Sequence, residues 1–202
     1  PSGSATRLYG VCQYADGIVA VQVDSGNYNI YFTTDGTTWT QVNKSGASGG
    51  ITLVNLNAAA QTTRTVGSKQ VQFVLYEGNT EYGELFILDG ANKVAWFKIT
   101  GTTTKTYFYD EISTFTTAQW GTVYKDHLVV GGDSTNKETV YWSDAFAPTS
   151  FTGGTSGSLK FTDKIAGVKA WRDRLFIFGQ NGVSELSGIN GVPSVTSISR
   201  NM

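Results

Sequence analysis

Few residues in the sequence could carry acid–base or metal chemistry. His127 is the only histidine and Cys12 the only cysteine. A zinc site built from several imidazole or thiolate ligands is therefore excluded, and so is a disulfide within the chain. We interpret His127 as a structural polar residue at the start of a strand and Cys12 as a small buried hydrophobe. The alternatives are a general base or metal ligand at His127 and a reactive nucleophile at Cys12.

Paired carboxylates are the other group that could do chemistry, since glycoside hydrolysis needs two of them. The candidates by residue type are Asp110, Glu111, Asp126, Asp144 and Asp173. Asp126 and Asp173 occupy equivalent positions of an internal repeat, which favours turn residues over catalytic ones.

The loop 133–136 has the oxygen-bearing residues of a calcium loop but lacks the Glu and the glycine spacing of a dedicated one. A solvated turn is the favoured interpretation. We therefore predict no catalytic residue, no cofactor and no metal site.

Aromatic side chains are the remaining candidates for a binding site. Those that could line a sugar platform or a protein interface are Tyr107, Tyr109, Trp120, Trp142 and Phe151. The same residues could instead fill the space between packed sheets. We keep Tyr107, Tyr109 and Trp120 as candidate contacts to a glycan or a partner.

The composition limits the classes of partner. Fifteen basic and sixteen acidic side chains give a net charge of −1, so there is no basic stripe of the kind that non-specific nucleic-acid binding requires. No apolar run approaches the roughly 20 residues of a membrane span, and the first residues do not have the form of a signal peptide. A charged fraction of 15% with 24 glycines is typical of a strand-and-turn protein with an uncharged polar surface, a profile shared by virion proteins and lectins.

An internal repeat indicates the architecture that must position these residues. The run 124–130 (YKDHLVV) matches 171–177 (WRDRLFI), 47 residues later. Weaker copies occur at 14–21 and 82–87. Repeats of this length in a chain of short strands indicate β-propeller blades.

The strand pattern gives four blades of four antiparallel strands each. We expect these blades at approximately 6–43, 70–113, 118–162 and 164–200, with an insertion or connection at approximately 44–69. The run Ala58–Gln61 could form one helical turn, but it is too short for a stable helix. Dipeptides such as Asp16-Gly17 and Asn181-Gly182 suit tight hairpin turns. The predicted fold is an all-β propeller or partial propeller, forming one domain or a fragment of one over residues 1–202. A closed four-bladed ring and a half ring completed by further sequence both remain open.

The stretch Thr33–Trp39 (TTDGTTW) resembles the Asp-box of sialidase-type propellers, whose pattern is Ser-x-Asp-x-Gly-x-Thr-Trp. It lacks one residue between Asp and Gly and begins with Thr. In that family the Asp-box is a hairpin element, not a catalytic one. The arginine cluster and the Tyr–Glu pair that sialidase chemistry requires have no recognisable counterpart here.

The two best copies of the repeat resemble the propeller segments of bacteriophage tail proteins, the nozzle or tail tubular protein B-like family of short-tailed phages and related virion proteins. The motif residues are Tyr124, Asp126, Leu128, Tyr141, Trp142, Ser143, Asp144, Pro148, Phe151, Trp171, Asp173 and Leu175. The resemblance is close over 118–188 and loose over most of the chain. Proteins of that family are several times longer, so this chain would be a fragment, a reduced relative or a propeller of another virion component.

The resemblance implies a structural protein of the virion tail, without catalytic residues. Such a protein would contact other tail proteins and form a homo-oligomeric ring around the DNA exit channel, with passing contact to DNA. Three alternatives remain: a propeller that binds a host glycan, a hydrolase of sialidase or glycosidase type, and a cellular scaffold that presents loops to protein partners.

Overall fold

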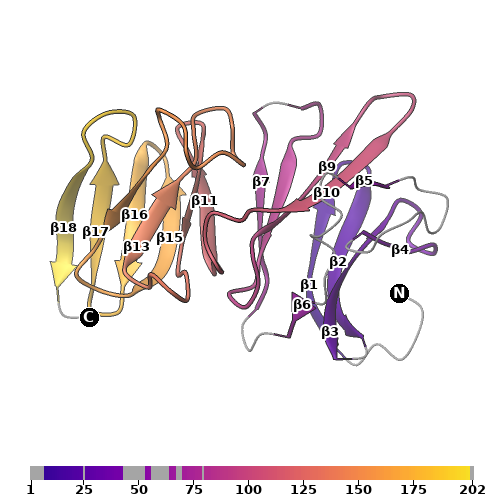
Figure 1. The fold of residues 1–202 in the computed structure, drawn as a ribbon, viewed down its shortest axis with the longest axis horizontal. Helices are drawn as coiled ribbons and strands as arrows, with labels where there is room; N and C mark the ends of the chain where they lie inside the picture. The colour runs from indigo at the N-terminus through magenta and orange to yellow at the C-terminus, as the bar shows by residue number, and fades with distance from the viewer. Residues whose placement is uncertain are drawn as a thin grey trace. The chain divides into compact units, whose positions relative to one another are not determined.

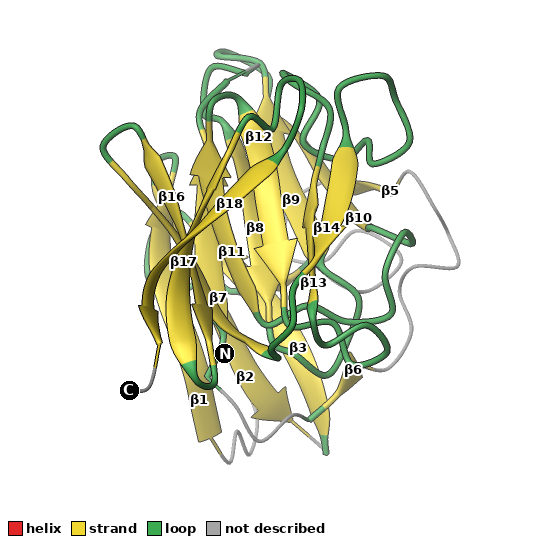
Figure 2. Cartoon of the chain, turned by 90° about the vertical axis from the view of Figure 1, so that its left-hand side faces the viewer, coloured by secondary structure: helices red, strands yellow, loops and turns green. Residues whose placement is uncertain are grey.

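The computed structural model describes residues 7–24, 26–42, 53–55, 64–66, 70–78 and 80–200. These residues form strands and turns, with no helix among them (Figures 1 and 2). The strands make four sheets, and the chain divides into two compact units, 1–112 and 113–202, that hold two sheets each. The predicted fold class, an all-β propeller type with about four antiparallel blade sheets, is confirmed. In the described residues no helix is long and apolar enough to span a membrane.

The first sheet is an antiparallel meander with one added strand. Its strands are β1 (Arg7–Tyr14), β2 (Gly17–Asp24), β3 (Asn27–Thr33) and β4 (Thr40–Gln41), and β6 (Arg64–Thr65) pairs with β3. The second sheet consists of β7 (Gln72–Tyr76), β8 (Glu84–Leu88), β9 (Ala95–Thr100) and β10 (Thr106–Glu111), and β5 (Leu53–Asn55) pairs in parallel with β10. The expected connection 44–69 thus adds one short strand to the first sheet and one to the second. The expected helical turn at Ala58–Gln61 lies outside the described residues.

The third and fourth sheets are plain four-stranded meanders. The third contains β11 (Trp120–Tyr124), β12 (His127–Gly131), β13 (Thr139–Trp142) and β14 (Gly157–Lys160). The fourth contains β15 (Ile165–Trp171), β16 (Arg174–Gly179), β17 (Gly182–Ser187) and β18 (Ser194–Arg200). The 47-residue repeat is therefore the β11–β12 hairpin and its copy, β15–β16.

The turn chemistry explains the polar part of the repeat. Tyr124 pairs with His127 across a two-residue turn in which Lys125 and Asp126 have φ values of 47° and 63°. Two successive positive φ values are the signature of the tight hairpin turn that matches strand twist, and Asp tolerates this conformation. Arg172, at the position of Lys125, also has a positive φ of 55°.

Each unit has its own core between its two sheets. In unit 1 the ring of Phe97 lies 5.6 Å from Tyr14 and 5.4 Å from Phe32, measured between centroids. In unit 2, Tyr124 and Val129 of the third sheet share a core with Leu175 and Ile177 of the fourth. Strands β8 and β12 are buried along their whole length, which explains why their sequences are apolar without alternation.

Candidate functional site

The aromatic residue of the repeat links one sheet to the next. Tyr124 ends β11, and its hydroxyl donates a 2.9 Å hydrogen bond to the carbonyl oxygen of Asp173, in the turn before β16. In unit 1, Tyr14 ends β1 and donates a 2.8 Å hydrogen bond to the carbonyl of Gly83, directly before β8. Its hydroxyl also accepts a bond from the Ile99 amide at 3.2 Å, and burial raises the pKa of Tyr14. The motif aromatic is therefore a tether between sheets in both units.

His127 is fully buried, and both of its ring nitrogens are occupied. Nδ1 lies 2.5 Å from the carbonyl oxygen of Ser143, and Nε2 contacts the side-chain oxygen of Asn190, which precedes β18. Ser143 in turn accepts a 2.9 Å bond from the Leu128 amide through its hydroxyl. The imidazole thus connects the third and fourth sheets and has no nitrogen left for a metal or a substrate.

Asp144 organises the connection between β13 and β14. Its Oδ1 accepts hydrogen bonds from the amides of Thr155 and Ser156, both at 2.9 Å, and its Oδ2 accepts one from the Ser150 hydroxyl at 2.7 Å. The bond from Ser150, with the further donors from Thr155 and Ser156, lowers the pKa of Asp144. The Asp144 carboxylate therefore holds the β13–β14 connection in place through hydrogen bonds.

The other residues of the same motif support this loop. Pro148 is buried, and Phe151 packs edge-on against Phe115 with centroids 5.1 Å apart. Trp142 is 3% exposed, and Leu128 and Leu175 are fully buried. Tyr141 lies 5.7 Å from Phe115.

The Asp-box-like stretch forms a comparable turn in unit 1. Asp35 Oδ1 accepts hydrogen bonds from the amides of Thr37 at 2.8 Å and Thr38 at 2.7 Å. These two donors lower the pKa of Asp35. The hydroxyl of Thr33, which stands where the Asp-box pattern has Ser, donates a hydrogen bond to the same oxygen at 3.0 Å. The stretch closes a turn after β3, and its geometry provides no catalytic group.

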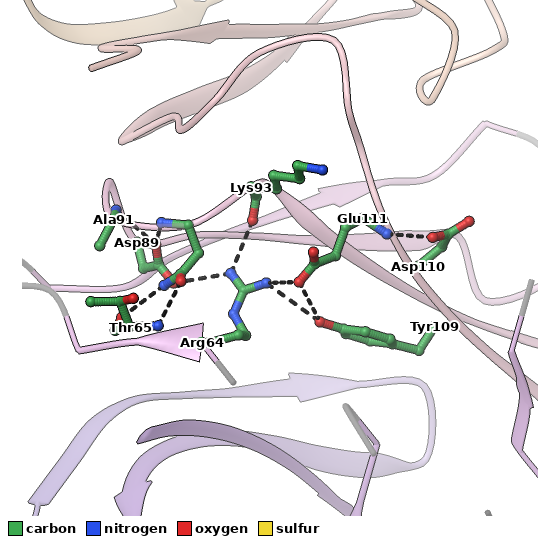
Figure 3. Close-up of polar contacts among 9 residues, drawn as sticks. Arg64, Thr65, Asp89, Ala91, Lys93, Tyr109, Asp110 and Glu111 are labelled. Atoms are coloured by element: carbon green, nitrogen blue, oxygen red, sulfur yellow. Dashed lines mark hydrogen bonds and ion pairs between the residues drawn. The ribbon is translucent and has the colours of Figure 1, made fainter. Parts of the chain in front are cut away.

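A buried polar cluster of unit 1 is centred on Arg64 of β6 (Figure 3). Arg64 is 3% exposed, and its guanidinium pairs with Asp89 at 3.0 Å and Glu111 at 2.6 Å. It also donates to the carbonyl of Lys93 at 3.0 Å. The hydroxyl of Tyr109 lies 3.4 Å from the guanidinium and donates to Glu111 at 3.1 Å.

This cluster joins the two sheets of unit 1, because Arg64 belongs to the first sheet and its partners to the second. Burial acts to lower the pKa of Arg64, but the charges of Asp89 and Glu111 outweigh it and raise the pKa above its usual value. Burial raises the pKa of Tyr109, which stays protonated. Sequence reasoning missed this cluster, and its only local sign was a lone arginine beside an Ala/Thr-rich run.

The carboxylates of Asp110 and Asp133 are engaged in local hydrogen bonds, whereas Asp126 and Asp173 are exposed turn residues. Asp110 accepts a 2.7 Å hydrogen bond from the Glu111 amide. Asp126 and Asp173 lie in tight turns, where their backbone carbonyls accept bonds from Phe146 and from Tyr124. Asp133 holds the amides of Thr117 at 2.9 Å and Asn136 at 3.1 Å, as a turn residue would. The described residues contain no group of three His, Cys, Asp or Glu side chains that could hold a metal ion.

Two of the three candidate contact aromatics are in the wrong place for contact. Tyr109 is completely buried and Tyr107 is 8% exposed, so neither ring can stack on a sugar or reach a partner. Trp120 is half-buried against the core of unit 2. Trp171, which was predicted only as a fold residue, is 57% exposed. Phe178 of the fourth sheet is also exposed, and so is Phe146 in the β13–β14 connection.

Unit 2 also contains an open cleft of about 710 Å³ between the end of β14 and strands β16 to β18. Its lining includes Lys160, Phe161, Asp163, Asn181 and Ser197. Asp163 accepts a 2.5 Å bond from the Asn181 amide, so its carboxylate is held against the wall of the cleft. A mixed lining with one aromatic ring can bind a small polar ligand.

Comparison with known proteins gave no match, neither to a family model nor to a curated protein sequence.

Proposed function

We propose that this chain is a non-catalytic structural component of a bacteriophage virion tail, similar to the nozzle or tail tubular protein B-like family. It works by assembling with other tail proteins and with copies of itself in a ring around the DNA exit channel. The proposal starts from the resemblance of residues 118–188 to that family.

One observation supports a non-catalytic role above the others: three polar side chains of the third sheet and its β13–β14 connection are used within the fold. Tyr124 tethers two sheets, His127 is bonded at both nitrogens, and Asp144 binds three donors of its own loop. General acid–base catalysis needs a group within hydrogen-bond reach of a substrate proton. Groups occupied in this way favour a structural role.

The charge balance fits a channel wall. A net charge of −1 spread over 202 residues offers few phosphate contacts. Because Lys and Arg contacts to phosphates provide most of non-specific DNA affinity, a wall without a basic stripe lets DNA pass.

Glycan binding is the alternative that one observation favours, namely the cleft beside Phe161. Its volume lies in the usual range for ligand pockets, about 300–1,000 Å³. A glycan array with the purified chain tests this alternative, with Phe161→Ala as the variant that should lose the signal and Val192→Ala, which is 89% exposed in the β17–β18 loop, as its control.

The decisive experiment for the main proposal is immunogold electron microscopy of the phage whose genome encodes the chain, using antibody raised against the purified chain. We expect gold at the tail, and labelled particles should be absent when the gene is deleted. Virions without gold would overturn the proposal. Turnover of a fluorogenic glycoside that disappears in Asp126→Asn or Asp144→Asn would overturn its non-catalytic part.

A further inference from the structure

The fourth sheet carries both Asn-Gly pairs of the sequence, Asn181-Gly182 and Asn190-Gly191. Both asparagines are exposed and lie in turns, the first between β16 and β17 and the second between β17 and β18. Asparagine is a chemically labile residue. It is most labile before glycine, because glycine has no Cβ that would keep its amide nitrogen away from the asparagine side chain. The chain therefore offers the same chemistry in two different local structures.

The reaction at such a pair is an internal displacement followed by hydrolysis. The backbone nitrogen of the glycine loses its proton and attacks Cγ of the asparagine, which closes a five-membered imide, and the side-chain nitrogen leaves as ammonia. Water then opens the imide at one of its two carbonyl groups and gives either aspartate or isoaspartate. Water is the only co-reactant, and nothing is oxidised or reduced. The rate therefore depends on how freely the glycine nitrogen and the asparagine Cγ can meet.

At Asn190 both reacting groups are held in place. The side-chain oxygen of Asn190 contacts Nε2 of the fully buried His127 ring, and the amide of Gly191 donates a 2.9 Å hydrogen bond to the carbonyl of Gly188. Attack at Asn190 requires both contacts to open and leaves a buried imidazole nitrogen without its partner. Each hydrogen bond that must open first slows the reaction on the order of fivefold, so the fold should slow Asn190 at least about 25-fold.

Asn181 is held less tightly. Its side-chain nitrogen donates a 3.2 Å hydrogen bond to Asp163, and its backbone amide donates one to the same carboxylate at 2.5 Å. Only the first of these restrains the side chain, and it holds the nitrogen that leaves. Gly182 pairs with Arg200 at the very end of the β17–β18 ladder, where strands open most easily. The fold should therefore slow Asn181 only about fivefold, through its one side-chain bond.

The product would change the cleft of unit 2, because Asp163, Asn181 and Gly182 all line it. The lining contains one cation, Lys160, and one carboxylate, Asp163. Deamidation replaces the amide that donates to Asp163 by a second carboxylate, so an attractive contact becomes a repulsion between like charges. Isoaspartate also adds a backbone atom to the turn between β16 and β17. The cleft thus gains a negative charge and loses the bond that holds Asp163 against its wall.

We propose that Asn181 is a site of spontaneous deamidation in the folded chain, that its contacts with His127 and Gly188 protect the Asn190-Gly191 pair, and that the reaction makes the cleft acidic as the protein ages. The modification needs no enzyme and no partner. It does not depend on the proposed role in a virion tail, because it follows from the two turns and the cleft alone.

Peptide mass mapping of the purified chain during incubation at mildly alkaline pH tests the proposal, with one sample kept folded and one unfolded in urea. In urea the two asparagines should react at similar rates, because each precedes glycine. In the folded sample Asn181 should react about fivefold more slowly than in urea and Asn190 at least about 25-fold more slowly. Isoelectric focusing of the folded sample should show one more acidic band that grows at the rate of the Asn181 product.

Removing the restraint on Asn181 gives the sharpest result. Asp163→Ala should raise the rate at Asn181 about fivefold, toward its rate in urea, and leave Asn190 unchanged as a control within the same molecule. Thr162→Ala, at an exposed neighbour in the cleft lining, is the matched control and should behave as the wild type. Circular dichroism checks that both variants fold. Equal rates at the two asparagines in the folded chain, no product at Asn181 while the urea sample reacts, or an unchanged rate in Asp163→Ala would each overturn the proposal. None of these results affects tail labelling, so the two proposals fail separately.

Discussion

Replacing Arg64 by alanine removes the one cation from a buried cluster with two carboxylates. Arg64 is 3% exposed, Asp89 is 2% exposed, and the pair distances are 3.0 Å and 2.6 Å. Removing one partner of a buried ion pair costs about 3–5 kcal/mol, because a charge is left buried without compensation. Asp89 keeps its hydrogen bonds from the amides of Ala91 and Asn92, at 2.9 Å and 2.8 Å. We therefore expect the lower end of the range, about 3 kcal/mol.

Differential scanning calorimetry and urea unfolding measure this cost. A loss of about 3 kcal/mol lowers the unfolding temperature of a chain of this size by roughly 6–12 °C. The matched control is Arg174→Ala, which breaks an ion pair whose arginine side chain is 50% exposed, and which should leave the transition unchanged within error. If Arg64→Ala shifted the transition no more than the control, the cluster would not hold the sheets of unit 1 together.

A second variant separates the buried charge from lost packing. In the triple variant Arg64→Met, Asp89→Asn and Glu111→Gln no charge remains in the cluster, while the size of each side chain is kept approximately. Replacing a buried ion pair by neutral residues is often neutral in stability. We expect it to recover at least half of the loss, and a triple variant less stable than Arg64→Ala would contradict the electrostatic explanation.

Three further predictions follow from the tethers and loops. Tyr124→Phe should cost about 1 kcal/mol in urea unfolding and Tyr14→Phe about 2 kcal/mol, because the first hydroxyl only donates while the second donates and accepts. The pKa of Asp144 is lowered, so its carboxylate stabilises the fold above its unfolded-state pKa of about 4 and loses this effect as the pH falls through the folded value. Asp144→Asn should therefore reduce the acid sensitivity measured by urea unfolding between roughly pH 7 and pH 2. Burial raises the pKa of Cys12 to about 11, so its reaction with a disulfide reagent near pH 8 should be about tenfold or more slower than in the urea-unfolded chain.

Each of these has a clear contrary outcome. Equal losses for the two tyrosine variants would mean that the accepted bond at Tyr14 adds nothing. A wild type and an Asp144→Asn variant with parallel pH profiles would mean that the loop hydrogen bonds do not persist in solution. Equal thiol reactivity before and after unfolding would show that Cys12 is not held in a desolvated position.

The strands could be predicted closely because their signals are local. The β16–β17 hairpin, and the copies at 124–130 and 171–177, are encoded by turn dipeptides and apolar runs within a few residues of one another. The two short strands β5 and β6 could not be predicted, since each depends on pairing with a strand far along the chain. The Arg64 cluster has the same origin, because its partners are 25 and 47 residues away.

The aromatic candidates show where local reasoning ended. Tyr107 and Tyr109 are two residues apart on β10, so they point to the same face of the sheet, and Phe108 points to the other. The sequence KTYFYD predicts a strand but does not say which face is covered. In the structure the first sheet covers the face that carries the two tyrosines. If the other face of the strand were covered, every buried side chain of β10 would be exposed and every exposed one buried.

Tyr124 and Trp171 make the same point from one repeat position. Both precede a tight turn with a cation and an aspartate, yet Tyr124 is 4% exposed and Trp171 is 57% exposed. The difference arises from the neighbour, because the fourth sheet covers Tyr124, whereas no described sheet of unit 2 covers Trp171. Tyr14 and Tyr124 are each covered by the next sheet of their unit, whereas Trp171 stays exposed because no further described sheet follows in unit 2. An exposed aromatic side chain at a position that elsewhere makes a sheet-to-sheet contact favours assembly over catalysis.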